Sequence, residues 1–265
     1  MAGRSAKRWP MALVTGASSG IGRAFAVALA ARGSGLVLVA RRRDRLEELA
    51  GQLREGTSAT VETMVADLTE PDDRATVEDR LRDASRPVDL LVNNAGVGGH
   101  GPFAQRPIEY EDREIRLNVL APVHLTSAAL PGMIERRSGG IVNVSSVASI
   151  QPVPFVATYA ATKAYLTSFS QAVHEEVRGQ GVTVLALLPG FTTTEFHDAA
   201  DMTRSNVPGP AWLTSEAVAE AGLRALDRGQ AVCIPGIGYR ILVAVSRHVP
   251  MGVNRAFTRQ IGRHA

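Results

Sequence analysis

One short stretch near the start of the chain constrains the fold more than any other feature. Met11–Val14 has the composition of a buried strand, Thr15-Gly16-Ala-Ser-Ser-Gly20-Ile21-Gly22 that of a tight turn, and the alanine-rich residues up to Arg32 that of a helix. Glycines let the backbone approach a bound group closely, and a helix N-terminus offers unpaired N–H groups to a phosphate. The pattern predicts the first βαβ unit of a dinucleotide-binding sheet, although its spacing is T-G-x-x-x-G-x-G and not the common G-x-G-x-x-G. The turn residues predicted to bind the cofactor are Gly16, Ser18, Ser19, Gly20, Ile21 and Gly22.

The rest of the chain alternates apolar runs with amphipathic segments, which favours an α/β fold with a parallel sheet. The further predicted strands are Leu36–Ala40, Val61–Val65, Val88–Val92, Ile141–Val144, Val182–Leu188 and Ala231–Ile234. The predicted helices are Asp44–Arg54 with Asp44 as its N-cap, Glu111–Glu135 with a bend at Pro122, Thr158–Arg178 and Thr214–Arg228.

The end of the second strand indicates which dinucleotide is bound. In NAD-binding units an acidic residue there takes the ribose 2′-hydroxyl, whereas an arginine accommodates a 2′-phosphate. Here the strand ends at Ala40 and is followed by Arg41-Arg42-Arg43, and Asp44 comes too late. Because guanidinium groups bind phosphate oxygens in pairs of hydrogen bonds, we predict NADP(H) bound by Arg41 and Arg42. The alternative is that these arginines only begin a solvated helix. That would explain Arg43, but it would not explain why the strand end lacks an acidic residue.

Other strand ends carry small or polar residues, where ligands of open α/β sheets bind. Asp67 and Leu68 follow the third strand; Asp67 is predicted to accept a hydrogen bond from the adenine amino group, or else to cap the helix that begins near Pro71. The fourth strand ends in Asn93-Asn94-Ala95-Gly96, of which Asn94, Ala95 and Gly96 are predicted to pack against the cofactor. The sixth ends in a segment from which Pro189, Gly190, Thr192 and Thr194 are predicted contacts.

Tyr159 and Lys163 are the residues predicted to carry chemistry. They are four residues apart in a predicted helix and so share one face. An opposite charge at close range can lower a phenolic pKa of about 10 by roughly 1–3 units, which makes proton transfer near neutral pH feasible. Ser146 lies 159 − 146 = 13 residues earlier, at the end of a strand, and its hydroxyl can hold the reacting oxygen.

The distribution of cationic residues supports a special role for Lys163. Of the 29 basic residues only Lys7 and Lys163 are lysines, and all the others are arginines. A compact ammonium group with rotatable donors is chemically distinct from a guanidinium fork. The alternative is that Lys163 is an ordinary lysine on a surface helix, without a function. The Y-x-x-x-K spacing alone would not exclude this alternative.

Asn118 is a further candidate because it lies inside a predicted helix. Asparagine is a poor residue for a helix interior, since its side chain competes with backbone hydrogen bonds. Its neighbours Leu117, Val119 and Leu120 are apolar, which favours a buried side chain with partners over a surface position.

The overall composition excludes several classes of protein. The 265 residues carry a net charge of +3 with scattered arginines and 5% aromatic residues, which argues against nucleic-acid binding. The single cysteine, Cys233, cannot form an internal disulfide, so we expect a cytoplasmic protein. No His/Cys cluster indicates a metal site, and no run approaches the ~20 apolar residues of a membrane span.

The sequence divides into three parts. Residues 1–10 form an N-terminal extension, residues 11–236 a single Rossmann-type domain, and residues 237–265 a basic tail. Residues 191–213 contain irregular apolar positions and two prolines, which are typical of a substrate loop. Pro250 is predicted to open an amphipathic helix in the tail; such a helix more often packs on the domain or on another subunit than on a membrane.

Together these motifs resemble the short-chain dehydrogenase/reductase family, over about Met11 to Pro235. The resemblance implies a doubly wound, mostly parallel seven-stranded sheet with helices on both faces. It implies a catalytic tetrad of Asn118, Ser146, Tyr159 and Lys163, with Tyr159 and Lys163 also contacting the cofactor. The segment from Pro189 to Thr194 would hold the nicotinamide carboxamide. Members commonly form homodimers or homotetramers through the two long helices, here about 111–135 and 158–178.

The resemblance also implies a reaction: NADPH-dependent reduction of a ketone or aldehyde, or the reverse oxidation of an alcohol. In the family, Ser146 and Tyr159 would hold the carbonyl oxygen, Tyr159 would donate the proton, and Lys163 would lower the pKa of Tyr159 and bind the nicotinamide ribose. Asn118 would position a water that relays protons to solvent. The alternatives are a non-catalytic NADP-binding sensor and an enzyme at a membrane surface that reduces lipids or 3-oxoacyl groups.

Overall fold

The computed structural model describes residues 9–194 and 212–246. Most of the predicted N-terminal extension, most of the predicted substrate loop and the helix predicted to start at Pro250 lie outside the described residues.

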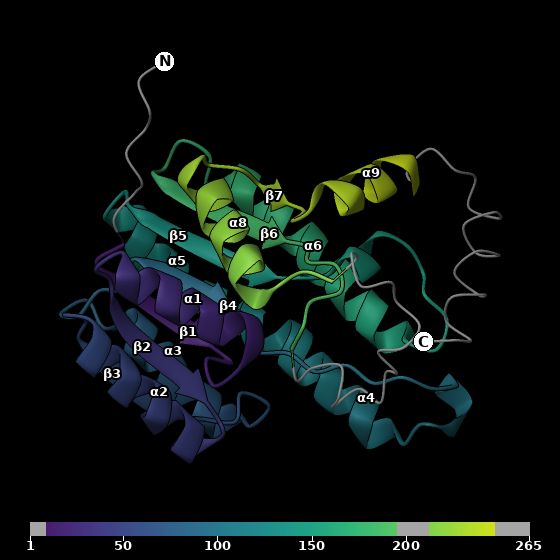
Figure 1. Ribbon diagram of the computed structural model, residues 1–265, viewed down its shortest axis with the longest axis horizontal. Helices are drawn as coiled ribbons and strands as arrows, with labels where there is room; N and C mark the ends of the chain where they lie inside the picture. The colour runs from purple at the N-terminus through teal and green to yellow at the C-terminus, as the bar shows by residue number, and fades with distance from the viewer. Residues whose placement is uncertain (1–8, 195–211, 247–265) are drawn as a thin grey trace.

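The core of the fold is a seven-stranded sheet in which every pair of neighbouring strands is parallel (Figure 1). The spatial order of the strands reverses between β1 and β4, which places a ligand crevice at their carboxyl ends. The predicted doubly wound sheet is therefore confirmed. In spatial order the strands are β3 (Val61–Val65), β2 (Gly35–Ala40), β1 (Met11–Thr15), β4 (Leu90–Asn93), β5 (Gly139–Val144), β6 (Val182–Leu187) and β7 (Val232–Cys233).

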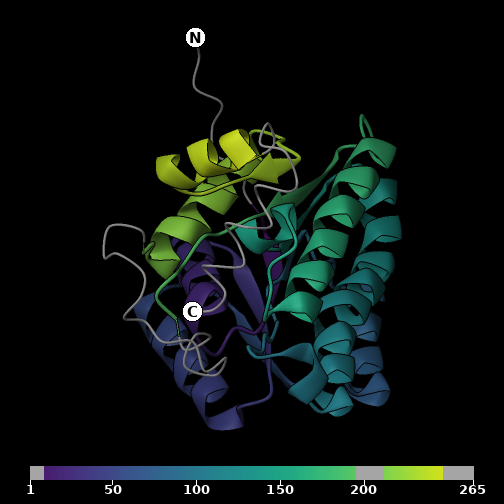
Figure 2. The same cartoon turned by 90° about the vertical axis from the view of Figure 1, so that its right-hand side faces the viewer.

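Helices cover both faces of this sheet (Figure 2). On one face lie α1 (Gly20–Ala31), α2 (Arg43–Gly56) and α8 (Ser215–Asp227). On the other lie α3 (Pro71–Arg82), α4 (Ile108–Ile115), α5 (Ala121–Glu135) and α6 (Ala157–Glu176). Short 3-10 turns occur at η1 (Phe103–Gln105) and η3 (Val147–Ile150), and α9 (Ile237–Ser246) follows β7.

The strands are apolar along their whole length because both faces are covered. In β1, Ala12 and Val14 pack with the helices of one face while Leu13 packs with those of the other, and all three are fully buried. Burial of each such side chain stabilises the fold by about 1.5–3 kcal/mol relative to exposure.

One prediction about a helix needs correction, and one helix was not predicted. Asp44 is not the N-cap of α2: the backbone is extended at Arg42, the helix begins at Arg43, and Asp44 lies in the first turn, where its charge favours the helix dipole. The helix α9 was not predicted, because its apolar residues lack a clear start signal beyond Gly236.

The predicted long helix exists but is irregular at a different place. It runs from Ile108 to Glu135, and residues Arg116–Leu120 form a π-helical turn, η2, ahead of Pro122. Proline has no N–H, and its ring would clash with the carbonyl four residues earlier, which belongs to Asn118. Local widening of the helix avoids that clash. This helix has the length and hydropathy of a membrane span, but half of its apolar window is buried within the fold, as in a core helix.

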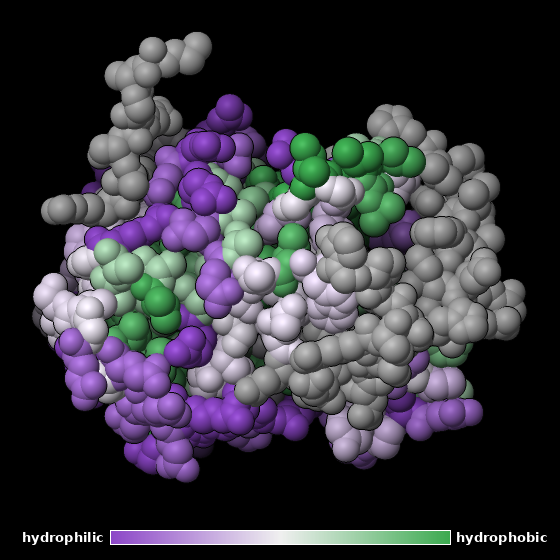
Figure 3. Space-filling view, viewed as in Figure 1, coloured by the Kyte–Doolittle hydropathy of each residue, from purple (hydrophilic) through white to green (hydrophobic). Residues whose placement is uncertain are grey.

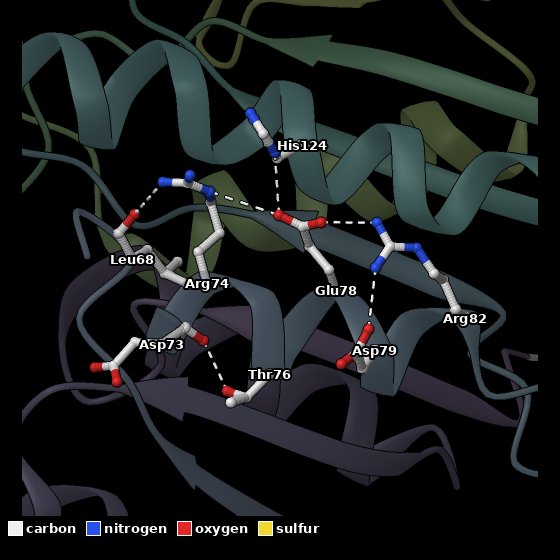
Figure 4. A network of polar contacts seen from close by, with 8 residues as sticks. All are labelled: Leu68, Asp73, Arg74, Thr76, Glu78, Asp79, Arg82 and His124. Carbon is white, nitrogen blue, oxygen red and sulfur yellow. Dashed lines mark hydrogen bonds and ion pairs between the residues drawn. The ribbon is translucent and has the colours of Figure 1, made fainter. Parts of the chain in front are cut away.

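A charged network joins α3 to α5 (Figure 4). The Glu78 carboxylate lies 3.5 Å from Arg74, 2.7 Å from Arg82 and 3.1 Å from His124. Burial of this carboxyl opposes its ionisation, but hydrogen bonds and charge from Arg82 and His124 outweigh burial and lower the pKa of Glu78. The network fixes two helices to each other.

A neutral polar cluster lies at the centre of the second face. Asn93 Nδ2 donates to Asn143 Oδ1 at 2.8 Å, and Asn143 Nδ2 donates to Ser170 Oγ at 2.9 Å. Thr126 of α5 accepts from Asn93 at 3.3 Å. These four residues, which we call the amide cluster, link β4, β5, α5 and α6.

Candidate active site

The glycine-rich turn after β1 has room for backbone atoms only. Gly16 and Gly20 have φ values of +63° and +52°, a region that favours glycine. A Cβ on Gly16 would lie 2.8 Å from Asn94 Nδ2, and one on Gly20 would lie 2.9 Å from Thr194 Cγ2. The turn thus opens toward two of the other predicted cofactor segments.

The end of β4 is bound to this turn. Asn94 Nδ2 donates to the carbonyls of Thr15 and Gly16, at 2.9 and 3.2 Å. Thr15 Oγ1 in turn accepts from the backbone N–H groups of Asn94 and Ala95, each at 3.0 Å. Thr15 was not singled out as a site residue, although it opens the T-G pattern.

The two predicted arginines lie beside the same turn. Arg42 Nη2 donates to the hydroxyls of Ser18 and Ser19, at 3.2 and 3.0 Å. Arg41 Nη1 lies 3.4 Å from Asp67 Oδ2. Both arginines therefore converge on the edge of the crevice between β1, β2 and β3, with exposed side chains that a ligand can reach.

The Asp67 carboxylate has hydrogen-bond partners that neither of its two predicted roles included. Its Oδ1 accepts from the N–H and the hydroxyl of Thr69, at 3.1 and 2.8 Å, which stabilises the turn before α3. The N-cap of α3 is Glu70, so Asp67 does not cap that helix. Leu68 is buried and its carbonyl accepts from Arg74. Contacts of Asp67 and Leu68 with an adenine stay a prediction.

Asn118 is buried and fully engaged, as expected from its apolar neighbours. Its side chain exchanges two hydrogen bonds with the backbone of Val97, and its Nδ2 also donates to Thr162 Oγ1 at 3.1 Å. A Cβ on Gly96 would lie 3.1 Å from Asn118 Oδ1 and 3.4 Å from Lys163 Nζ. The π-turn thus brings Asn118 beside Lys163, across the end of β4.

Ser146, Tyr159 and Lys163 meet at the end of β5. The Ser146 hydroxyl is hydrogen-bonded to the phenol of Tyr159, and it also accepts from the N–H of Ala148 at 3.1 Å. Lys163 is buried; its Nζ donates to the Val144 carbonyl at 2.9 Å and lies 5.8 Å from the centroid of the Tyr159 ring. The structure therefore brings all four predicted catalytic residues together.

The prediction that Lys163 makes Tyr159 unusually acidic is wrong for the protein without ligands. Burial raises the pKa of Tyr159 to about 12, the hydrogen bond with Ser146 opposes that rise, and the charge of Glu114 adds to it. Burial also lowers the pKa of Lys163 to about 8, while Glu114 opposes that fall. The phenol is therefore held in its protonated form, which suits a proton donor.

The segment after β6 closes the site from the other side. Val147 N donates to the Pro189 carbonyl at 3.0 Å, and Thr192 Oγ1 donates to the Gly190 carbonyl at 2.9 Å. The ring of Tyr239, from α9, fills the space a Cβ on Gly190 would need, and its hydroxyl accepts from Phe191 N at 3.0 Å. Tyr239 was missed because it lies in the tail, outside the recognised motifs.

A charged cluster behind the catalytic residues was also missed. Arg106 forms an ion pair with Glu111 of α4 and lies 3.8 Å from Glu114 of the same helix. Glu114 is 2% exposed, and its Oε1 has no hydrogen-bond partner among the described residues. Its position one turn before Asn118 was the available signal. Among the described residues, no group of three or more His, Cys, Asp or Glu side chains could hold a metal ion.

The crevice fits a dinucleotide. A Cβ on Gly16, Gly20 or Gly22 would lie within 2.9 Å of other protein atoms, so the turn can pack this closely only with glycine at these positions. The N-terminus of α1 faces the turn, and Arg41 and Arg42 stand at its outer end. Gly96 lies beside Lys163, where β4 ends.

A family model described as short chain dehydrogenase matches residues 10–205. The chain belongs to the short chain dehydrogenase family. It is therefore an oxidoreductase that acts on CH–OH and C=O groups with a nicotinamide cofactor.

Relatives within this family include very-long-chain 3-oxoacyl-CoA reductases. The protein from Anas platyrhynchos is 32% identical over 84% of this chain and 72% of its own length. The Homo sapiens protein is 32% identical over 82% of this chain and 70% of its own length.

Solved structures agree with this assignment. A short-chain dehydrogenase from Sphingobium yanoikuyae, in complex with NADPH, superposes with a TM-score of 0.82 at 37% identity, over 90% of this chain and 94% of that one. A bulky-bulky ketone specific alcohol dehydrogenase from Comamonas testosteroni has a TM-score of 0.78 at 35% identity, over 97% and 94% of the two chains.

Proposed function

We propose that this protein is an NADPH-dependent reductase of ketones that carry large apolar groups. The observation that carries the proposal is the hydrogen-bonded pair Ser146–Tyr159 beside buried Lys163, at the nicotinamide end of a dinucleotide crevice. Its cellular location would be the cytoplasm, as the lone cysteine suggests.

In this reaction the Ser146 and Tyr159 hydroxyls hold the carbonyl oxygen. The nicotinamide supplies the hydride. Tyr159 gives its proton to the oxygen as negative charge develops there, a contribution of about 10²–10⁴ in rate. Lys163, fixed by the Val144 carbonyl, and Asn118, fixed by Val97 and Thr162, border the path by which Tyr159 regains a proton.

The preference for NADPH rests on the positions of Arg41 and Arg42. Both lie where a ribose 2′-phosphate would sit, and the strand end offers no acid for a 2′-hydroxyl. The NADPH complex of the related Sphingobium yanoikuyae protein supports this choice. Replacing both residues by alanine should weaken NADPH binding roughly 100-fold and leave NADH binding almost unchanged. Equal losses for the two cofactors, measured by fluorescence titration, would refute the assignment.

The substrate class follows from the residues at the rim of the site. The rings of Phe191 and Trp212 pack at a tilt of 49° with centroids 5.7 Å apart, and the Tyr239 ring covers Gly190. Aromatic rings at this place favour apolar substituents on the carbonyl. The names of two kinds of relative support large substituents: the Comamonas testosteroni enzyme is specific for bulky-bulky ketones, and others are very-long-chain 3-oxoacyl-CoA reductases.

A panel of ketones, aldehydes and 3-oxoacyl thioesters tests the proposal through NADPH consumption. We expect turnover on bulky aryl or long-chain ketones, little on acetone-sized compounds, and turnover reduced at least 100-fold in Tyr159→Phe. Tight NADPH binding without turnover of any compound would instead favour a non-catalytic sensor. The retained Tyr159 and Lys163 argue against that reading.

A second candidate is a reductase that works at a lipid surface. On α9 the aliphatic side chains of Ile237, Ile241, Leu242 and Val245 are exposed, and they form a green patch in Figure 3. From Arg228 to the C-terminus the sequence contains six arginines and no Asp or Glu. An exposed apolar face with a cationic flank suits an anionic membrane.

Sedimentation with anionic and neutral vesicles tests this second candidate. Binding to anionic vesicles should be lost in Ile241→Glu/Leu242→Glu and kept in Ile108→Glu, a change of another exposed aliphatic residue on α4. Equal sedimentation of all three proteins would remove the idea.

We also propose that the protein is a homo-oligomer through α4, α5 and α6. Ile115 of α4, Leu120 of the adjoining turn η2 and Tyr165 of α6 are exposed apolar side chains. Light scattering should give a dimer or tetramer, and Tyr165→Glu should lower the mass. A monomer at all concentrations would contradict this.

A further inference from the structure

The Glu114 carboxyl is a buried ionisable group that the proposed reaction does not use. It is 2% exposed, and a residue of this kind is rarely buried unless it has a partner. Its Oε2 lies 3.8 Å from Arg106, which is itself paired with Glu111, and its Oε1 has no hydrogen-bond partner among the described residues. The residues of α4 and of the loop before it therefore neutralise the Glu114 carboxylate only in part.

The packing of helices directs Glu114 toward the catalytic residues. Glu114 precedes Asn118 by four residues, so both lie on the face of the helix that packs against α6. Across that interface Asn118 meets Thr162, the residue directly before Lys163. The charges that face Glu114 are Glu111 on its own helix, Arg106 on the loop before it, and Lys163 on α6, with the ionisable Tyr159 also nearby.

We propose that Glu114 is a positioning residue for catalysis: its carboxylate is the internal counter-charge that keeps the Lys163 ammonium protonated at neutral and mildly alkaline pH. Its role in turnover rests on the proposed function, whereas its effect on Lys163 does not.

The charges have the signs that this role needs. Burial lowers the pKa of Lys163 to about 8, and the Glu114 charge opposes that fall. Burial raises the pKa of Glu114 to about 7, with a further rise from Glu111 and a reduction from Arg106 and Lys163. The carboxylate therefore forms at a lower pH than the one at which Lys163 would lose its proton. Between these two values both groups are charged, and they stabilise each other.

The lysine content of the chain makes a direct test practical. With only Lys7 and Lys163 present, a protein labelled with ¹³C at the lysine Cε gives two signals, and Lys7→Arg assigns them. We expect the Lys163 signal to titrate in the protein without substrate, and its midpoint to fall by about one pH unit in Glu114→Gln. Glu109→Gln removes the same charge from an exposed position on α4 and should leave the midpoint unchanged. Glu114→Asp, which keeps the charge, should retain most of the wild-type value.

A Lys163 midpoint that is equal or higher in Glu114→Gln than in wild type would overturn the proposal. Should Glu114→Gln fail to fold, Glu114→Asp is measured in its place, and a Lys163 midpoint well below the wild-type value in that variant would equally overturn the proposal. Neither result depends on the identity of the substrate, so the proposal can fail while the reductase activity stands.

The rate of carbonyl reduction offers a second readout. With the best ketone of the panel, Glu114→Gln should match wild type near pH 6, where Glu114 is already neutral, and lose about 5-fold in kcat/KM at pH 8. A purely structural role predicts the same loss at both pH values, and that result would also contradict the proposal.

Discussion

The two ends of α6 carry buried polar residues of different kinds. Near its C-terminal end, Ser170 completes the amide cluster with Asn143 and Asn93, whose groups are neutral at every physiological pH. Near its N-terminal end, Tyr159 and Lys163 are ionisable, and the incompletely neutralised Glu114 faces them. The same helix therefore contributes to the amide cluster, which stabilises the sheet, and to a cluster of ionisable groups, whose burial has an energetic cost.

The difference indicates how structure and chemistry are separated in this fold. A buried amide or hydroxyl that finds partners costs little, whereas a buried charge opposes folding unless it is neutralised. The catalytic end keeps such groups because proton transfer needs them. We therefore expect substitutions at the two ends to differ in size, sign and pH dependence.

The largest effect is expected for Tyr159→Phe. Loss of the phenolic hydroxyl should reduce kcat by about 10²–10⁴, because the proton donor is removed. The free energy of unfolding should change little, since the ring is kept and the hydrogen bond with Ser146 contributes about 1 kcal/mol. NADPH oxidation with a bulky ketone and urea denaturation measure the two quantities. If Tyr159→Phe keeps the wild-type kcat, the N-terminal end of α6 is not the catalytic end, and the comparison fails.

Glu114→Gln is expected to stabilise the fold at alkaline pH. Folding raises the pKa of Glu114 from 4.5 to about 7, so its contribution to stability is present at acid pH and is lost as the pH rises through 7. This rise in the pKa corresponds to about 3 kcal/mol at pH 8, and to less than about 1 kcal/mol at pH 5. Urea denaturation at both pH values measures it. Destabilisation at pH 8 would show that the carboxylate is well neutralised.

Asn143→Ala should have the opposite sign and no pH dependence. It removes the partner of Asn93 and Ser170 and leaves a small void, which should cost about 2 kcal/mol. Denaturation at pH 5 and pH 8 should give the same loss, while the pH profile of the remaining activity stays as in wild type. A pH-dependent loss would mean that the two clusters are coupled through α6.

Thr162→Val should give the smallest effect and sharpen the comparison. Thr162 lies at the catalytic end but is neutral; its hydroxyl accepts from Asn118 and donates to the Tyr159 carbonyl at 2.8 Å. We expect a loss of about 1 kcal/mol at every pH, as in the amide cluster. If the loss depends on pH, the position on α6, and not the charge of the residue, determines the behaviour.

The sequence predicted the fold and most of the site because these depend on local patterns. The turn at Gly16 to Gly22, the strands and the pair Tyr159–Lys163 follow from composition and spacing over fewer than about 15 residues. The structure confirmed the sheet and brought Asn118, Ser146, Tyr159 and Lys163 together, although Ser146 and Asn118 come from separate elements.

What the sequence could not predict depends on packing between distant segments. The pKa of Tyr159 was misjudged because spacing along a helix gives proximity but not burial, and burial dominates here. Glu114 resembles any acidic residue of an exposed helix until α6 covers it. Tyr239 reaches Gly190 only because α9 folds back over the end of β6.

Transfer of deuterium from NADPH labelled at the hydride-donating carbon tests the central claim most directly. With a bulky ketone as substrate, mass spectrometry should find one deuterium on the new carbinol carbon for each NADPH consumed, and Tyr159→Phe should form that product at least 100-fold more slowly. Consumption of NADPH without labelled alcohol, or labelled alcohol formed at an undiminished rate by Tyr159→Phe, would contradict the account.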